Sequence, residues 1–70
     1  MITKFKERIT ILWNESGLPI KEYARKIGVP YTTLMGWFTS KIDPRASSVA
    51  MVSEATHVSA DWLLGLSEKR

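Results

Sequence analysis

Apolar side chains recur every three or four residues along most of this chain, which is the spacing of amphipathic helices. Glycines and prolines interrupt the pattern and divide it into short segments, with no convincing strand between them. The sequence therefore predicts an all-α fold. The five expected helices cover about residues 3–16, 19–27, 30–38, 44–56 and 59–65.

The boundaries of these helices carry residues that suit helix ends. Thr3 and Ser59 are expected to cap the first and fifth helices, and Asp43-Pro44 is expected to begin the fourth. Three glycines stand where a left-handed residue commonly ends a helix: Gly17, Gly28 and Gly65. Residues 1–66 are then expected to form a single domain, followed by a fraying tail at residues 67–70.

The first predicted helix has a single apolar stripe. Its members are Phe5, Ile9, Leu12 and Trp13, and we expect Trp13 to be a core residue. Charged side chains of the same helix are expected to point away from the stripe: Lys4, Arg8 and Glu15.

Residues 20–40 have the spacing of a helix-turn-helix. Two helices that cross at a short turn need a small residue at the crossing, and Ala24 supplies it. Gly28 can take the positive φ that such a turn requires, and Val29 follows it as an apolar anchor. Leu34 and Trp37 then anchor the second helix from beneath. These five residues in register predict that the helix at about residues 30–38 is the one that meets DNA.

The side of this helix opposite Leu34 and Trp37 carries the candidate contacts. Residues near the N-terminus of a recognition helix reach base edges in the major groove. The base-contacting candidates are Tyr31, Thr32, Met35 and Gly36. The missing side chain of Gly36 suits a close approach either to the groove or to another helix. The phosphate-contacting candidates surround the helix ends, with Ile20 acting through its backbone: Ile20, Lys21, Lys26, Thr33, Thr39, Ser40 and Lys41.

Charge and composition narrow the function classes. The net charge is +3, and residues 1–45 carry eight Lys or Arg against four Asp or Glu, which suits phosphate binding. An ordinary solvated surface has a similar excess, so charge alone leaves nucleic acid undecided. There is no Cys, and His57 has no carboxylates clustered around it, so no metal, cofactor or enzyme activity is expected. No apolar run approaches the ~18 residues of a membrane span, and no small-molecule ligand is indicated.

The chain resembles the lambda-repressor-like helix-turn-helix family, which includes Cro, the phage cI repressors and the Xre-type regulators. The resemblance covers about residues 5–65 and is carried by Tyr23-Ala24, Ile27-Gly28-Val29, Thr33-Leu34, Trp37, Pro44 and residues 58–65. It implies a compact five-helix bundle that binds a double-stranded DNA operator as a homodimer and regulates transcription. It also implies a cytoplasmic, nucleoid-associated protein of a bacterium or phage-infected cell. The resemblance implies base contacts at Tyr31, Thr32, Met35 and Gly36. It implies phosphate contacts around Ile20, Thr39 and Lys41.

The sequence departs from this family at several of those positions. Ile20 and Tyr31 stand where the family often has Gln, Phe38 stands where it often has Glu, and Ser40 replaces a usual Gly. These differences leave the fold expectation intact and leave the operator sequence open.

The alternative hypothesis is a protein-interaction module on the same scaffold, such as an anti-repressor or an antitoxin-like partner. Tyr31, Met35, Phe38 and an outward Trp62 or Leu66 would then contact the partner protein. Trp62 and Leu66 are also the candidates for a dimer surface, although Trp62 fits the core of its own domain equally well.

Overall fold

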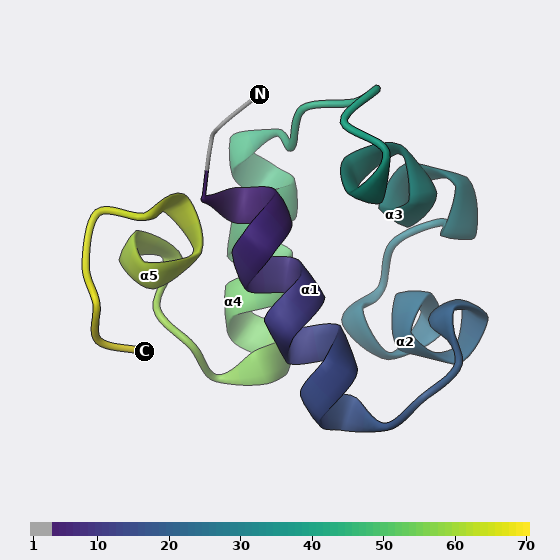
Figure 1. Ribbon diagram of the computed structural model, residues 1–70, viewed down its shortest axis with the longest axis horizontal. Helices are drawn as coiled ribbons and strands as arrows, with labels where there is room; N and C mark the ends of the chain where they lie inside the picture. The colour runs from purple at the N-terminus through teal and green to yellow at the C-terminus, as the bar shows by residue number, and fades with distance from the viewer. Residues whose placement is uncertain (1–3) are drawn as a thin grey trace.

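The computed structural model describes residues 4–70 and folds them into five helices without a strand. The helices are α1 (Phe5–Ser16), α2 (Ile20–Ile27), α3 (Tyr31–Phe38), α4 (Ala46–Thr56) and α5 (Ala60–Leu64). In Figure 1, α1 crosses in front of α4, with α2 and α3 on one side and α5 on the other. All five helices expected from the sequence are present, so the all-α bundle is confirmed.

α1 supplies the centre of the hydrophobic core. Phe5 and Ile9 are fully buried, and the Phe5 ring meets the Trp37 ring edge to face, with 5.2 Å between the centroids. α1 packs against α2, α3 and α5, so it joins both sides of the bundle. Val52 of α4 and Leu63 of α5 are also fully buried. The helix-turn-helix therefore rests on a core to which all the helices contribute.

Trp13 lies at the edge of this core. Its side chain is partly buried, and its Nε1 donates a hydrogen bond to the Leu18 carbonyl oxygen at 2.8 Å. Its ring centroid is 5.2 Å from that of Phe38, the last residue of α3. Trp13 thereby ties the end of α1 to the loop before α2 and to the end of α3.

The helix ends agree with most of the expected signals. The glycines that follow α1, α2 and α5 all have positive φ: Gly17, Gly28 and Gly65. Ser59 caps α5, because its hydroxyl oxygen accepts a hydrogen bond from the Trp62 N–H at 3.0 Å. These signals depend on local backbone chemistry, which is why the sequence reveals them.

The start of α4 differs from the expectation. Asp43-Pro44 belongs to the preceding loop, and α4 begins at Ala46, after an extended Arg45 with φ −83° and ψ 158°. No side chain caps this helix start. The expected Thr3 cap of α1 lies outside the described residues.

Arg8 is buried, so the expectation that it points away from the core is wrong. The residue is 7% exposed, and its guanidinium carbon lies 4.7 Å from the centroid of the Trp62 ring. Its Nη1 donates to the Trp62 carbonyl oxygen at 3.3 Å, and its Nη2 forms an ion pair with Glu68 at 3.2 Å. Residues from the other end of the chain cover this side of α1 and supply these partners.

The last residues, for which the sequence predicted a fraying tail, return to α1 and α5. The Arg70 guanidinium donates two hydrogen bonds to the Glu15 carboxylate, at 2.8 and 2.6 Å, and lies 4.8 Å from the Trp62 ring centroid. The Ser59 N–H donates to the Arg70 carbonyl oxygen at 3.0 Å. Trp62 is 5% exposed, which places it in the core of its own domain.

Candidate nucleic-acid interface

α2, the turn at residues 28–30 and α3 form the expected helix-turn-helix. Gly28 has φ 81°, and the N–H groups of Gly28 and Val29 both donate to the Ala24 carbonyl oxygen, at 3.0 and 3.1 Å. Ala24 is 2% exposed, as a residue at a close helix crossing should be. Pro30, with φ −61° and ψ 145°, precedes α3 and directs the chain into it.

α3 is held by one face and exposes another. Leu34 and Trp37 are fully buried, and both were expected to be the anchors of this helix. Tyr31 is 38% exposed at the first position of α3, and Thr32 beside it is also exposed. Met35, one turn further along, is partly buried. Three of the four expected base-contacting residues therefore lie where a ligand could reach their side chains.

Gly36, the fourth expected base-contacting residue, differs from the other three because it is covered by the following loop. The residue is buried, and a Cβ at this position would overlap the side chain of Ile42 from the following loop. Its carbonyl oxygen accepts hydrogen bonds from the N–H groups of Lys41 and Ile42, at 2.9 and 3.2 Å. The glycine is needed so that the loop can fold back against α3.

The loop that leaves α3 carries three of the expected phosphate contacts. The Thr39 hydroxyl donates to the Met35 carbonyl oxygen at 3.0 Å and so closes the end of the helix. Ser40 has φ 62°, the left-handed conformation for which glycine is the usual residue. Thr39, Ser40 and Lys41 are all exposed, so their side chains can be approached from solvent.

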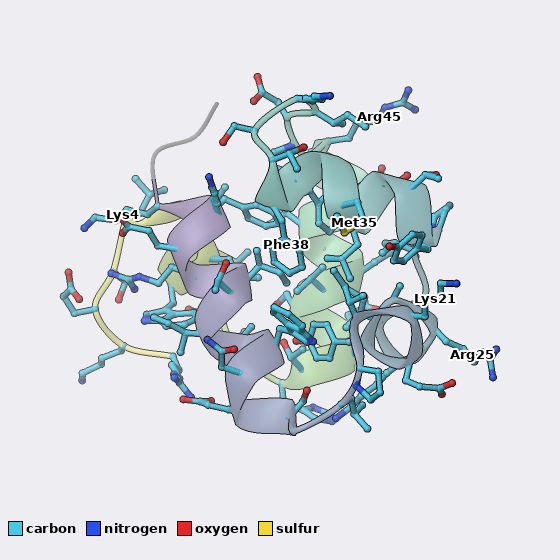
Figure 2. The ribbon with its side chains drawn as sticks, turned by 45° about the vertical axis from the view of Figure 1, so that its right-hand side comes forward. Lys4, Lys21, Arg25, Met35, Phe38 and Arg45 are labelled. Carbon is cyan, nitrogen blue, oxygen red and sulfur yellow. The ribbon has the colours of Figure 1, made fainter. Side chains whose placement is uncertain are left out.

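The start of α2 carries two more of these candidates. Ile20 is partly buried against the core, so only its backbone is suited to a phosphate. No side chain caps α2 or α3, which leaves their first N–H groups for water or an anion. Lys21 is exposed, and its ammonium lies 5.4 Å from the centroid of the Tyr31 ring. In Figure 2, Lys21 and Arg25 project to the same side of the molecule, away from Lys4.

Lys26 lies elsewhere, so its grouping with the phosphate contacts is not supported. It borders a hollow at the C-terminal ends of α1 and α4, together with Glu15 and His57. Lys21 and Arg25 share one face of α2 because they are four residues apart, whereas Lys26 is turned by a further 100° or so. Lys26 therefore starts from a different side of α2 than Lys21 and Arg25 do.

Arg45 is a candidate that sequence reasoning overlooked. It borders a hollow between α3 and the start of α4, which is also lined by Thr33, Ser47 and Ser48. Figure 2 shows Arg45 projecting outward beyond α3. Its position immediately before a helix, in a basic stretch, was the available signal, but the expected earlier start of α4 concealed it.

The described part of the chain offers little for other chemistry. Residues 4–70 contain no group of three or more His, Asp or Glu side chains that could hold a metal ion. None of the helices in that range is both long enough and apolar enough to cross a membrane.

Comparison with known proteins agrees with this geometry. The chain is 39% identical over 59 residues to a protein from Haemophilus influenzae named an uncharacterized HTH-type transcriptional regulator. The domain contains a helix-turn-helix, formed by α2 and α3. The matched segment is 84% of this chain and 24% of the relative, so the chain spans about a quarter of that protein's length. No family model matches the chain, and no solved structure matches it.

Proposed function

We propose that this domain is a sequence-specific, double-stranded DNA-binding transcriptional regulator of the lambda-repressor-like type. The observation that carries the proposal is the orientation of α3. Its anchors Leu34 and Trp37 are fully buried, while Tyr31 and Thr32 are exposed at its N-terminal end. A helix presented in this way fits the major groove, with its first residues at the base edges.

The exposed side chains of α3 suit base reading. The Thr32 hydroxyl is both donor and acceptor, and its methyl group can contact the methyl group of thymine. Tyr31 adds a phenol hydroxyl on an aromatic ring, and Met35 adds an apolar, adaptable surface. Such a set favours sites that present thymine methyl groups over sites that require a bidentate Arg contact to guanine.

The groups around α3 suit the DNA backbone. Lys21 and Arg25 lie on one side of α3, and Lys41 and Arg45 lie in the loop beyond its other end. Thr33, Thr39, Ser40 and the uncapped start of α2 at Ile20 add neutral hydrogen-bonding groups. Phosphates on either side of the groove would then fix the depth and direction of α3.

We further propose that the domain binds a bacterial or phage operator as a homodimer, because one recognition helix reads only half of a palindrome. Two copies of a domain whose longest dimension is 28 Å can place their α3 helices about 34 Å apart, one turn of DNA. The face between α4 and α5 is the candidate contact, because small apolar residues line a hollow there: Pro44, Ala46, Val49, Ala50, Ala60 and Leu64. Leu66, which follows α5, is 75% exposed.

The protein-interaction alternative loses two of its candidate contacts. Trp62 is covered by Arg8 and Arg70, and Phe38 is partly buried against Trp13. Neither side chain is free to present a large apolar surface to a partner protein. We therefore favour DNA as the ligand.

The test is selection of bound duplexes from a random pool, with the mass of the complex measured alongside. We expect an enriched palindrome, two chains per duplex, and log K that falls steeply with log salt. Specific binding should exceed non-specific binding by roughly 10³-fold or more. Absence of any enriched sequence, together with weak binding that does not respond to salt, would contradict the proposal.

A further inference from the structure

Lys21 and Tyr31 face each other across the helix-turn-helix. The Lys21 ammonium nitrogen lies 5.4 Å from the centroid of the Tyr31 ring. Lys21 is the second residue of α2, and Tyr31 is the first of α3, so the contact joins the two helices beside the proposed reading surface. We propose that Lys21 is a positioning residue that holds the Tyr31 ring for base reading, in addition to attracting phosphate. This inference rests on the proposed function.

Lys21 is available for this contact. The ion pairs found in residues 4–70 engage other cations, namely Lys4, Arg8, Arg25 and Arg70. An ammonium over the face of an aromatic ring is attracted by the negative charge of the π system, and a distance below about 6 Å is within the effective range. The Tyr31 ring is thus the partner that the fold offers to this charge.

Tyr31 needs such a partner because it begins a helix on the exposed side. The residue is 38% exposed, whereas Leu34 and Trp37, which share its helix, are held by the core. A side chain without neighbours loses rotational freedom when it binds, and that loss reduces affinity. An exposed cation–π contact raises the population of the held ring by about two- to fivefold, which removes part of this cost before DNA arrives.

Ile20, the first residue of α2, has no polar side-chain atom with which to hold Tyr31. Its side chain is turned into the core, and α2 has no side-chain cap. Lys21 is therefore the first side chain of α2 able to act on the reading surface. Lys21 would then hold the Tyr31 ring and also place its own positive charge near a DNA phosphate.

Arg25 provides a matched control. It lies four residues after Lys21 on the same face of α2, carries the same charge, and pairs with Glu22 at 4.0 Å rather than with an aromatic ring. Lys21→Gln and Arg25→Gln each remove one positive charge from this face. Only Lys21→Gln releases the Tyr31 ring, whereas Lys21→Arg retains a cation over it.

The contact is tested first without DNA, by NMR of the whole chain. Protons held above an aromatic ring are shifted to high field, so we expect high-field side-chain methylene resonances for Lys21. Tyr31→Phe should retain the shift because the ring remains, and Tyr31→Leu should abolish it. Ordinary lysine methylene shifts in the unsubstituted protein would overturn the inference, whatever the protein binds.

The role is then tested by repeating the selection of duplexes with the variants. Tyr31→Leu should identify the base pair that Tyr31 reads. We expect Lys21→Gln to reduce the preference at that base pair by about two- to fivefold. Arg25→Gln should weaken all duplexes alike, and Lys21→Arg should keep the preference. Equal, sequence-independent losses in Lys21→Gln and Arg25→Gln would overturn the positioning role and leave the proposed function standing. If the unsubstituted protein enriches no sequence while the NMR shift is present, the proposed function fails, and the positioning role fails with it.

Discussion

Some residues of α3 are covered by the rest of the protein, and others face solvent. Trp37 is fully buried against Phe5, Gly36 is covered by Ile42, and Thr32 faces solvent one turn earlier. A substitution at one of these positions should therefore affect either the fold or the proposed DNA contact, but not both. This separation makes the residue assignments testable one by one.

Thr32→Ala and Tyr31→Ala should reduce discrimination between DNA sites while leaving the fold intact. Each loses side-chain contacts to base edges, and the expected loss is about 1–3 kcal/mol in the difference between specific and non-specific binding. Lys41→Ala should instead weaken binding to every duplex and reduce the slope of log K against log salt. Affinities for the selected site and for scrambled duplexes at several salt concentrations measure both quantities. A change of base preference in Lys41→Ala alone would contradict this division of roles.

Gly36→Ala should destabilise the domain although alanine favours helices. The added Cβ would overlap Ile42, and such overpacking costs about 1–3 kcal/mol, against a gain of roughly 1 kcal/mol in helix propensity. The free energy of unfolding, measured with urea, gives the balance.

Truncation of the opposing side chain supplies the control for Gly36. Ile42→Ala removes the atoms that the new Cβ would meet, so the double variant Gly36→Ala/Ile42→Ala should be more stable than the sum of the two single effects predicts. Strictly additive changes in the free energy of unfolding would show that contact with Ile42 is not the cause of the destabilisation by Gly36→Ala.

At the scale of the element, the α2–α3 unit depends on one close crossing. Ala24 is 2% exposed, and its carbonyl oxygen receives the N–H groups of both Gly28 and Val29. Ala24 therefore has two roles. Its small side chain allows the helices to pack closely, and its carbonyl oxygen accepts the hydrogen bonds of the turn. Any enlargement at this point moves α3 relative to the core.

Ala24→Leu should therefore destabilise the fold by about 1–3 kcal/mol or more, because three extra carbon atoms must enter a packed crossing. Glu54→Leu is the control, since Glu54 is an exposed residue within α4 and outside the proposed dimer contact. Thermal unfolding followed by circular dichroism should separate the two variants clearly. Equal midpoints would count against the close packing of α2 and α3.

The elements that the sequence predicted correctly are those specified by local chemistry. Positive-φ glycines end three helices, and the apolar spacing of Leu34 and Trp37 identifies the buried side of α3. Gly36 was harder, because its neighbour Ile42 approaches through a loop whose path no periodicity reveals. Lys26 was grouped with the phosphate contacts because it lies near a helix end, whereas the rotation of the helix separates it from Lys21.

At the scale of the whole molecule, the C-terminal residues connect the two ends of the chain. Arg8 and Arg70 both lie over the Trp62 ring, and Glu68 and Glu15 pair with them respectively. Apart from the contact between Arg70 and Trp62, each of these contacts spans more than 50 positions in sequence. A charged tail with no apolar periodicity looks solvated in the sequence, so partners so far away could not be inferred from it.

The Glu15–Arg70 pair should make part of the stability dependent on acid. The hydrogen bond from Arg70 lowers the pKa of Glu15 below its ordinary value of 4.5. The unfolded chain therefore binds the proton more readily, and the stabilisation is complete above about pH 4.5 and lost as the pH falls further. Thermal unfolding midpoints of the unsubstituted protein and of Glu15→Gln should differ near pH 7 and converge as the pH falls below the pKa of Glu15 in the folded protein.

Glu54→Gln provides the control for this titration. Glu54 is exposed and takes part in none of the ion pairs found in residues 4–70, so its substitution should change the midpoint little at either pH. Arg70→Gln should reproduce the behaviour of Glu15→Gln, because each variant removes one half of the same pair. The difference in unfolding midpoint between Glu15→Gln and the unsubstituted protein could instead stay constant from neutral to acid pH. That result would show that the C-terminal residues are not held through the Glu15 carboxylate.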